Sequence, residues 1–286
     1  MPKHGIFIII TGGAGMSEFL SALSQPFMTR ALIVGTVISI CAALLGVILV
    51  LKRYALIGHG LADIGFASLS LAIALGWSPI YVSMPIVAAA SFAIMLISQK
   101  SGGNGDTAIG VVSTGALSLG IIITYLSGGM SVDVYSYMFG SILGTTDTDL
   151  VLSIILGLVV IVAFILLYNR LFMVTYDEVY AKACGINVTL YQFFISFLTA
   201  VTVVIGMRMM GTLLIASLII FPAIISKRLV KSFKSVVVVS SVVSVVCFLL
   251  GLCLSFFLNL PVGASIVAVN MVALLAAAVV SKVKKL

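Results

Sequence analysis

His59 and Asp63 are the two residues whose types and spacing could bind a metal ion. They stand four positions apart, so on a helix their side chains point the same way and can share one cation. Imidazole together with carboxylate suits borderline ions such as Zn²⁺, Mn²⁺ or Fe²⁺. Two ligands are too few for a closed site, and a second copy of the chain would bring two further ligands to a common axis.

The surroundings of this pair make it stand out. The chain is 62% hydrophobic and only 8% charged, and Asp63 is the one carboxylate that falls inside a predicted membrane span. A charge in the hydrocarbon core costs about 2.5 to 3.5 kcal/mol on insertion scales, so an embedded Asp63 is expected to face a polar path. The alternative is a structural hydrogen-bonded pair near the cytosolic end of the span, where Asp63 stays hydrated. Gly58 and Gly60 indicate an unwound stretch before the helix starts.

The composition predicts an all-α, polytopic integral membrane protein. Nine spans of about 20 residues leave only short loops and no room for a soluble catalytic domain. We expect these spans at about residues 29–51, 60–77, 79–98, 107–126, 150–168, 190–206, 211–225, 236–258 and 263–280. Residues 1–27 are expected to form a leader or an extracytoplasmic surface segment, and residues 28–286 the transmembrane domain.

The lysines and arginines orient this layout. Of the 15 such residues, only Lys3, Arg30 and Arg208 fall in segments placed outside, and the other twelve fall inside. This distribution follows the positive-inside rule and puts the amino terminus outside and the carboxyl terminus in the cytosol. Residues 211–225 are short for a span, and Pro222 near their end indicates a discontinuous or tilted helix. In an alternative layout with eight spans, residues 211–225 do not cross the membrane. The basic residues that follow them would then fit the positive-inside rule poorly.

A polar island at residues 175–187 interrupts two long apolar runs. It is typical of a short cytosolic helix, with Asp177 and Glu178 in the first turn, Lys182 towards the end and Gly185 as the stop. The alternative is an ordinary loop between two spans. Downstream lies a glycine-containing apolar segment, residues 207–222, which ends in Phe-Pro.

A Glu-x6-Gly island, one span and then this segment together resemble the permease subunits of bacterial ABC importers for zinc, manganese and iron(II). The resemblance implies the type II ABC importer permease fold and a homodimer. It also implies two copies of a separate ATPase and an extracytoplasmic metal-binding protein as partners. The island would be the coupling helix that docks on the ATPase, and the residues implied are Asp177, Glu178, Ala181, Lys182 and Gly185.

Such permeases often carry Gly-Asp-Gly-Leu-x-His along the metal path. This chain reads Gly-His-Gly-Leu-Ala-Asp at residues 58–63, so the two ligand types are exchanged. The exchange keeps the ligand chemistry and leaves the geometry and the metal preference open. By this layout Asp133, Asp147 and Asp149 lie outside and could contact an extracytoplasmic metal-binding protein, with a solvated loop as the alternative. Arg208, near the outer end of its span, could be a gate residue, with an interfacial, snorkelling arginine as the alternative.

Several other functions find no support in the sequence. No Gly-Lys-Ser/Thr phosphate loop is present, so any ATP hydrolysis belongs to a partner chain. The net charge of +7 is dispersed without aromatic interleaving, which does not indicate nucleic acid binding. The four cysteines lack Cys-x-x-Cys spacing and are expected to be small buried hydrophobes. The 12 methionines are scattered, which argues against a copper path.

The sequence therefore favours a membrane permease without catalysis or cofactor of its own, which carries a divalent metal ion across the bacterial cytoplasmic membrane. The rival is a secondary transporter that uses an ion gradient, with His59 and Asp63 as a proton relay. A passive channel or a membrane scaffold is a third hypothesis. Variants of Glu178 and Gly185 separate these hypotheses, because only an ABC permease needs an ATPase contact at the island.

Overall fold

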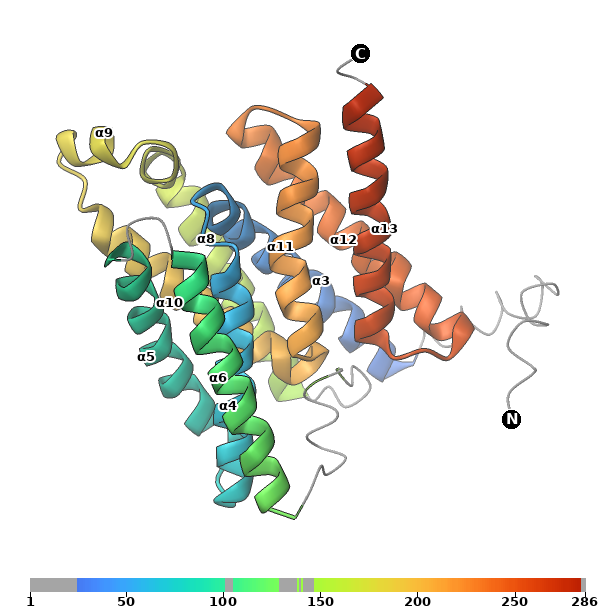
Figure 1. Ribbon diagram of the computed structural model, residues 1–286. Coiled ribbons are helices and arrows are strands. Elements are labelled where there is room, and N and C mark those ends of the chain that lie inside the picture. The colour runs from blue at the N-terminus through green and yellow to red at the C-terminus, as the bar shows by residue number, and fades with distance from the viewer. Residues whose placement is uncertain (1–24, 101–104, 129–137, 139, 141–146, 284–286) are drawn as a thin grey trace.

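The computed structural model describes residues 25–100, 105–128, 138, 140 and 147–283. All the regular elements in these ranges are helices, arranged as a bundle with one short helix at its edge (Figure 1). They are α3 (Pro26–Leu51), α4 (Leu56–Ala74), α5 (Pro79–Lys100), α6 (Gly105–Leu126), α8 (Asp147–Tyr176), α9 (Glu178–Ala183), α10 (Val188–Met210), α11 (Thr212–Leu229), α12 (Phe233–Leu258) and α13 (Val262–Val283).

Nine of the helices in the described ranges are long and apolar enough to cross a membrane. Only α9, with 6 residues, is too short. The predicted all-α fold with nine spans is therefore confirmed. Most spans extend beyond the predicted bounds, and the one that leads into the island runs on to Tyr176.

The predicted short segment after Gly211 is a full helix. Helix α11 has 18 residues, which at about 1.5 Å per residue gives close to the thickness of a bilayer core. It continues through Pro222 to Leu229. Gly211 alone separates it from α10, with φ of 87°, a left-handed conformation that side chains disfavour. The prediction of a discontinuous segment was therefore wrong, because the helix simply begins later and ends later.

Helix α3 forms the centre of the bundle. It packs against α8, α10, α11 and α12, and 78% of its most apolar stretch of 18 residues is buried. Its backbone approaches that of α11 so closely that a Cβ on Gly46 would lie 1.9 Å from the carbonyl oxygen of Ile219. By contrast, only 22% of the most apolar 18-residue stretch is buried in α6, and only 28% in α8. These outer helices present their apolar side chains to the surroundings of the protomer.

Local signals in the sequence explain where several helices begin and end. The side chains of Asp177, Asn187 and Ser232 each accept a hydrogen bond from a backbone N–H in the first turn of α9, α10 and α12. Asn259 ends α12 in the left-handed conformation. Helix α9, the turn between α11 and α12, and the end of α13 all lie at the same end of the bundle (Figure 1).

Candidate functional site

The first two turns of α4 carry His59 and Asp63. Because α4 is helical from Leu56, the predicted unwound stretch around Gly58 and Gly60 was wrong. The Asp106 carboxylate in the first turn of α6 lies near the backbone N–H of Leu56 at the start of α4, where a negative charge complements the helix dipole. Asp106 also falls within a candidate membrane span, Gly105–Leu126. The prediction that Asp63 is the only carboxylate within a span was therefore wrong.

The two glycines instead allow α4 to pack closely. A Cβ on Gly58 would lie 2.9 Å from the side chain of Ile219 on α11, and a Cβ on Gly60 would lie 2.9 Å from Ile109 on α6. The glycines flank His59 in the sequence and hold its turn of helix between α11 and α6. The backbone of this turn therefore packs closely on both sides, whereas the His59 side chain itself remains exposed.

The two candidate ligands lie next to each other. His59 Nε2 is 3.6 Å from Asp63 Oδ2, which is too long for a hydrogen bond. Ligand bonds of about 2.0 to 2.2 Å at the tetrahedral angle separate two ligand atoms by roughly 3.3 to 3.6 Å. The gap between the imidazole and the carboxylate thus suits one shared transition-metal ion.

Ser113 on α6 orients the carboxylate. Its hydroxyl donates a hydrogen bond to Asp63 Oδ2, the same oxygen that faces His59. The Asp63 side chain is only 10% exposed, whereas that of His59 is 53% exposed. The pair thus consists of a buried carboxylate that a hydroxyl holds in place and an imidazole that is open to the outside of the protomer. We call His59 and Asp63 together the candidate half-site, because they offer two of the four ligands of a closed metal site.

The half-site has no third ligand in the described part of the chain. No group of three or more histidine, cysteine, aspartate or glutamate residues in those ranges could hold a metal ion. Closed transition-metal sites usually have four ligands. The remaining positions would therefore be filled from outside this protomer, by water or by a second copy.

The island forms a short helix that is anchored on one side. Asp177 Oδ1 accepts a hydrogen bond of 2.9 Å from the Tyr180 N–H, and Ala181 is fully buried beside Val174 and Val188. Gly185 follows with φ of 77°, as predicted for the stop. The opposite side carries Val179, Tyr180 and Lys182, which are exposed.

Glu178 points towards the bundle. Its Oε1 lies 2.8 Å from Lys52 Nζ at the end of α3 and accepts a 2.8 Å hydrogen bond from Gln192 Nε2 on α10. The contact with Lys52 is an ion pair rather than an aligned hydrogen bond. Burial lowers the pKa of Lys52, whose side chain is 4% exposed, and the Glu178 carboxylate partly offsets that lowering. One carboxylate thus joins α9 to both α3 and α10.

The comparison with family models decides which class of membrane protein this is. The model described as "ABC 3 transport family" matches residues 24–281, which is nearly the whole chain. The chain belongs to the ABC 3 transport family. The predicted family resemblance is thereby confirmed.

Several curated relatives of this ABC 3 family chain have names that state a function, among them one for manganese and one for zinc. The manganese import system permease protein ScaB of Streptococcus parasanguinis is 30% identical over 258 residues, which covers 90% of this chain and 92% of ScaB. The high-affinity zinc uptake system membrane protein ZnuB of Haemophilus influenzae is 30% identical over 237 residues, covering 83% of this chain and 91% of ZnuB.

Solved structures share the fold of this family member. A chain of PsaBC from Streptococcus pneumoniae, in complex with a Fab, matches with a TM-score of 0.81 and 28% identity over 92% of this chain and 95% of that chain. An inward-facing putative metal-chelate type ABC transporter matches with a TM-score of 0.71 at 17% identity, covering 85% of this chain and 83% of its own, and shows the fold alone.

The other predicted residues of this ABC 3 family chain lie apart from the half-site. Arg208 is half-buried in the last turn of α10. Asp133 lies outside the described residues. Asp147, the first residue of α8, forms a 2.8 Å ion pair with Arg30 on α3. The ion pair of Asp147 with Arg30 does not involve His59 or Asp63.

Three residues that contact Asp63 or Glu178 were not predicted from the sequence, namely Ser113, Lys52 and Gln192. Ser113 lies 50 positions from Asp63, and nothing in its neighbourhood distinguishes it from the other hydroxyls in the spans. In the sequence, Lys52 was counted only as one of the positive charges that orient the membrane spans. Its place directly after a span could have suggested a partner on the island. Gln192 was a usable signal, because it is an amide within a predicted span and such a group requires a partner.

Proposed function

We propose that this chain is the membrane permease subunit of an ATP-driven importer of divalent transition-metal ions, manganese, zinc or iron(II). Membership of the ABC 3 transport family supports the class. The names of ScaB and ZnuB support a metal ion as the transported substrate. The observation that carries the proposal is the exposed outer side of α9, a docking surface on a helix whose inner side is anchored to the bundle.

The assembly that we propose contains two copies of this chain, two copies of an ABC ATPase and an extracytoplasmic metal-binding protein. The amino terminus is placed outside and the carboxyl terminus in the cytosol, because the end of the bundle with α9 is basic. Lys52 pairs with Glu178 of α9, and Lys227 and Lys282 lie in the last turns of α11 and α13, which end on the same side. The chain catalyses no covalent reaction and binds no cofactor of its own. ATP is hydrolysed by the partner.

The half-site gives the metal ion a place in the path. Two copies of the chain facing each other contribute two His59 and two Asp63 side chains, which together complete four ligands. Asp63 stays in place through Ser113, while the exposed His59 moves with the first turn of α4. A shift of one protomer against the other therefore makes or breaks the set of ligands and lets the ion pass.

The ion pair between Glu178 and Lys52 supplies the link to the ATPase. Lys52 ends α3 and stands seven positions before His59. Displacement of α9 by a closing ATPase therefore pulls on the turn that leads directly into the half-site. The hydrogen bond from Gln192 brings α10 into the same movement.

Acidic replacement of the outer side of α9 tests the docking. Val179→Asp, at a side chain that is 80% exposed, is expected to lower the amount of ATPase that copurifies by about tenfold or more, because buried interface positions do not accept an unpaired charge. Val283→Asp is the matched control, since Val283 is 66% exposed at the end of α13, away from α9. Full retention of the ATPase in Val179→Asp would contradict the proposal.

The rival function is a secondary transporter in which His59 and Asp63 relay protons. That transporter would work as a single polypeptide, and it would not need the outer side of α9. Uptake that persists in Val179→Asp without any bound ATPase would favour it. No feature of the described residues favours this rival over the importer.

A further inference from the structure

A groove opens on the outside of the bundle between α3, α8 and α12. Its volume is about 570 Å³, within the range of about 300 to 1,000 Å³ that is typical of ligand sites. The floor is apolar and includes Ile40 and Leu44 of α3 and Ile161 and Phe164 of α8. All four residues lie within candidate membrane spans. The groove is separate from His59 and from α9.

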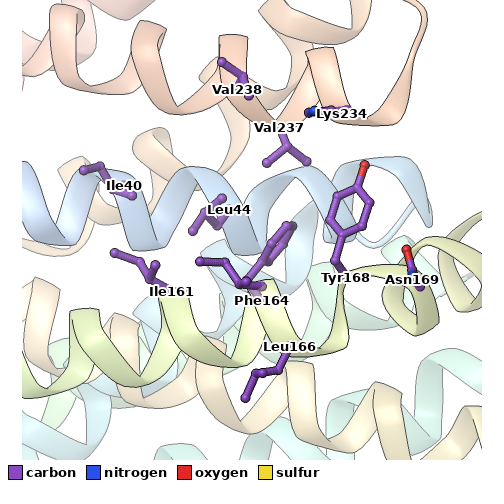
Figure 2. Close-up of a pocket in the computed structure, with 11 residues that line it drawn as sticks. Ile40, Leu44, Ile161, Phe164, Leu166, Tyr168, Asn169, Lys234, Val237 and Val238 are labelled. Carbon is purple, nitrogen blue, oxygen red and sulfur yellow. The ribbon is translucent and has the colours of Figure 1, made fainter.

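The groove is apolar at one end and polar at the other. Figure 2 shows Ile40 and Ile161 at one end, and Tyr168, Asn169 and Lys234 at the other. Tyr168 and Asn169 lie towards the end of α8 that leads to α9, and Lys234 lies in the first turn of α12. The polar end therefore lies at the end of the bundle that faces the cytosol in the proposed function.

Lys234 is available to a ligand. The side chain is exposed and forms no ion pair with another residue in the part of the chain that the structure describes. The Tyr168 ring is directed towards α12 (Figure 2) and packs against Phe233, with ring centroids 5.4 Å apart. This contact holds the phenol at the polar end, beside the lysine. A cation, a hydroxyl and an amide thus surround the mouth of an apolar groove.

We propose that the groove binds one acidic phospholipid, with an acyl chain along Ile40, Leu44 and Ile161 and the phosphate at Lys234 and Tyr168. Basic, groove-like sites between membrane helices on the cytosolic side suit anionic headgroups. Further positive charge is close by, because Arg53, Lys227 and Lys231 line a neighbouring depression on the same end of the bundle. The leaflet assigned to the lipid rests on the orientation in the proposed function.

A second copy of the chain is a less suitable occupant. The polar mouth of the groove carries a lysine and no carboxylate, so an identical surface would place one lysine against another in a symmetric contact. The rim residues Ile165 and Val238 are 68% and 53% exposed. They suit contact with lipid chains on either side of a bound phospholipid.

Native mass spectrometry of the full-length chain in detergent tests the proposal. Phosphatidylglycerol or phosphatidylcholine is added, and the lipids retained per chain are counted. We expect preferential retention of one phosphatidylglycerol by the native chain. Lys234→Gln is expected to weaken that retention about fivefold, the effect of one basic residue near an anionic surface. Ile161→Trp, which fills the apolar floor, is expected to lower retention of both lipids. Lys282→Gln removes the same charge on α13 and should leave retention unchanged.

Three results would overturn the proposal. Equal retention of phosphatidylglycerol by the native chain and by Lys234→Gln is one of them. Equal losses in Lys234→Gln and Lys282→Gln would be another, because they would indicate a nonspecific charge effect. The third is a disulfide between two copies carrying Val238→Cys, which would show that protein covers the groove. The assay needs neither ATPase nor metal ion, so its failure is distinguishable from failure of the proposed importer function.

Discussion

Alanine in place of His59 or of Asp63 is expected to lower metal-ion uptake about tenfold or more, the usual range for a change in or next to a metal's ligand set. His59 loses an imidazole that is open to the outside of the protomer, and Asp63 loses the carboxylate that Ser113 holds in place. Either change leaves each protomer with one ligand. Uptake of radioactive Mn²⁺ and Zn²⁺ is measured in cells with the complete transporter at matched membrane levels.

The exchange of the two residues is the control for this experiment. His59→Asp combined with Asp63→His keeps both ligand types on the same face of α4 and restores the order that related permeases often carry. We expect this double variant to retain more uptake than either alanine variant, with the ATPase still bound in all of them. Normal uptake in both alanine variants would make the pair structural and would place the metal path elsewhere.

Charge reversal at Glu178 is expected to uncouple transport from ATP hydrolysis. Glu178→Lys leaves the buried Lys52 without its counterion and opposes it with a second cation. Removing one partner of a fully buried ion pair costs about 3 to 5 kcal/mol. Because the Glu178 side chain is 41% exposed, we expect a smaller loss of stability, together with a loss of uptake while the ATPase stays bound. Uptake and ATP hydrolysis are measured on the same preparation.

The charge swap and a second ion pair serve as controls. Lys52→Glu combined with Glu178→Lys restores opposite charges and should recover part of the uptake. Asp147→Lys breaks an ion pair of the same length, 2.8 Å, whose partners are 36% and 76% exposed, and such exposed pairs contribute only about 0 to 1 kcal/mol. The apparent melting temperature should therefore fall more in Glu178→Lys than in Asp147→Lys. Equal melting temperatures and full uptake in Glu178→Lys would contradict the link.

The sequence predicted the parts of this molecule that depend on short-range pattern. Long apolar runs predict membrane helices, and each of the nine predicted spans, including the short one at residues 211–225, corresponds to a long apolar helix in the described ranges. The i, i+4 spacing predicted that His59 and Asp63 share one face of α4, because helical geometry fixes that relation locally. The polar island and Gly185 predicted α9 for the same reason.

Contacts between distant segments were not predictable. The bond from Ser113 to Asp63 depends on how α6 packs against α4, and one sequence without an alignment does not carry that information. The helical conformation of Gly58 and Gly60 was not predictable for the same reason, because it depends on packing against other helices. Glycine permits an unwound backbone, but it also permits close packing, and only the neighbouring Ile219 and Ile109 show that packing is the use here.

ATP-dependent uptake into sealed vesicles tests whether this chain is the permease of an ATP-driven metal-ion importer. The purified chain is reconstituted with its ATPase, the metal-binding protein is supplied outside, and ATP is enclosed inside. We expect radioactive Mn²⁺ or Zn²⁺ to accumulate only when ATP and a catalytically active ATPase are both present. Accumulation driven by an ion gradient, with this chain as the sole protein, would contradict it and would establish a secondary transporter instead.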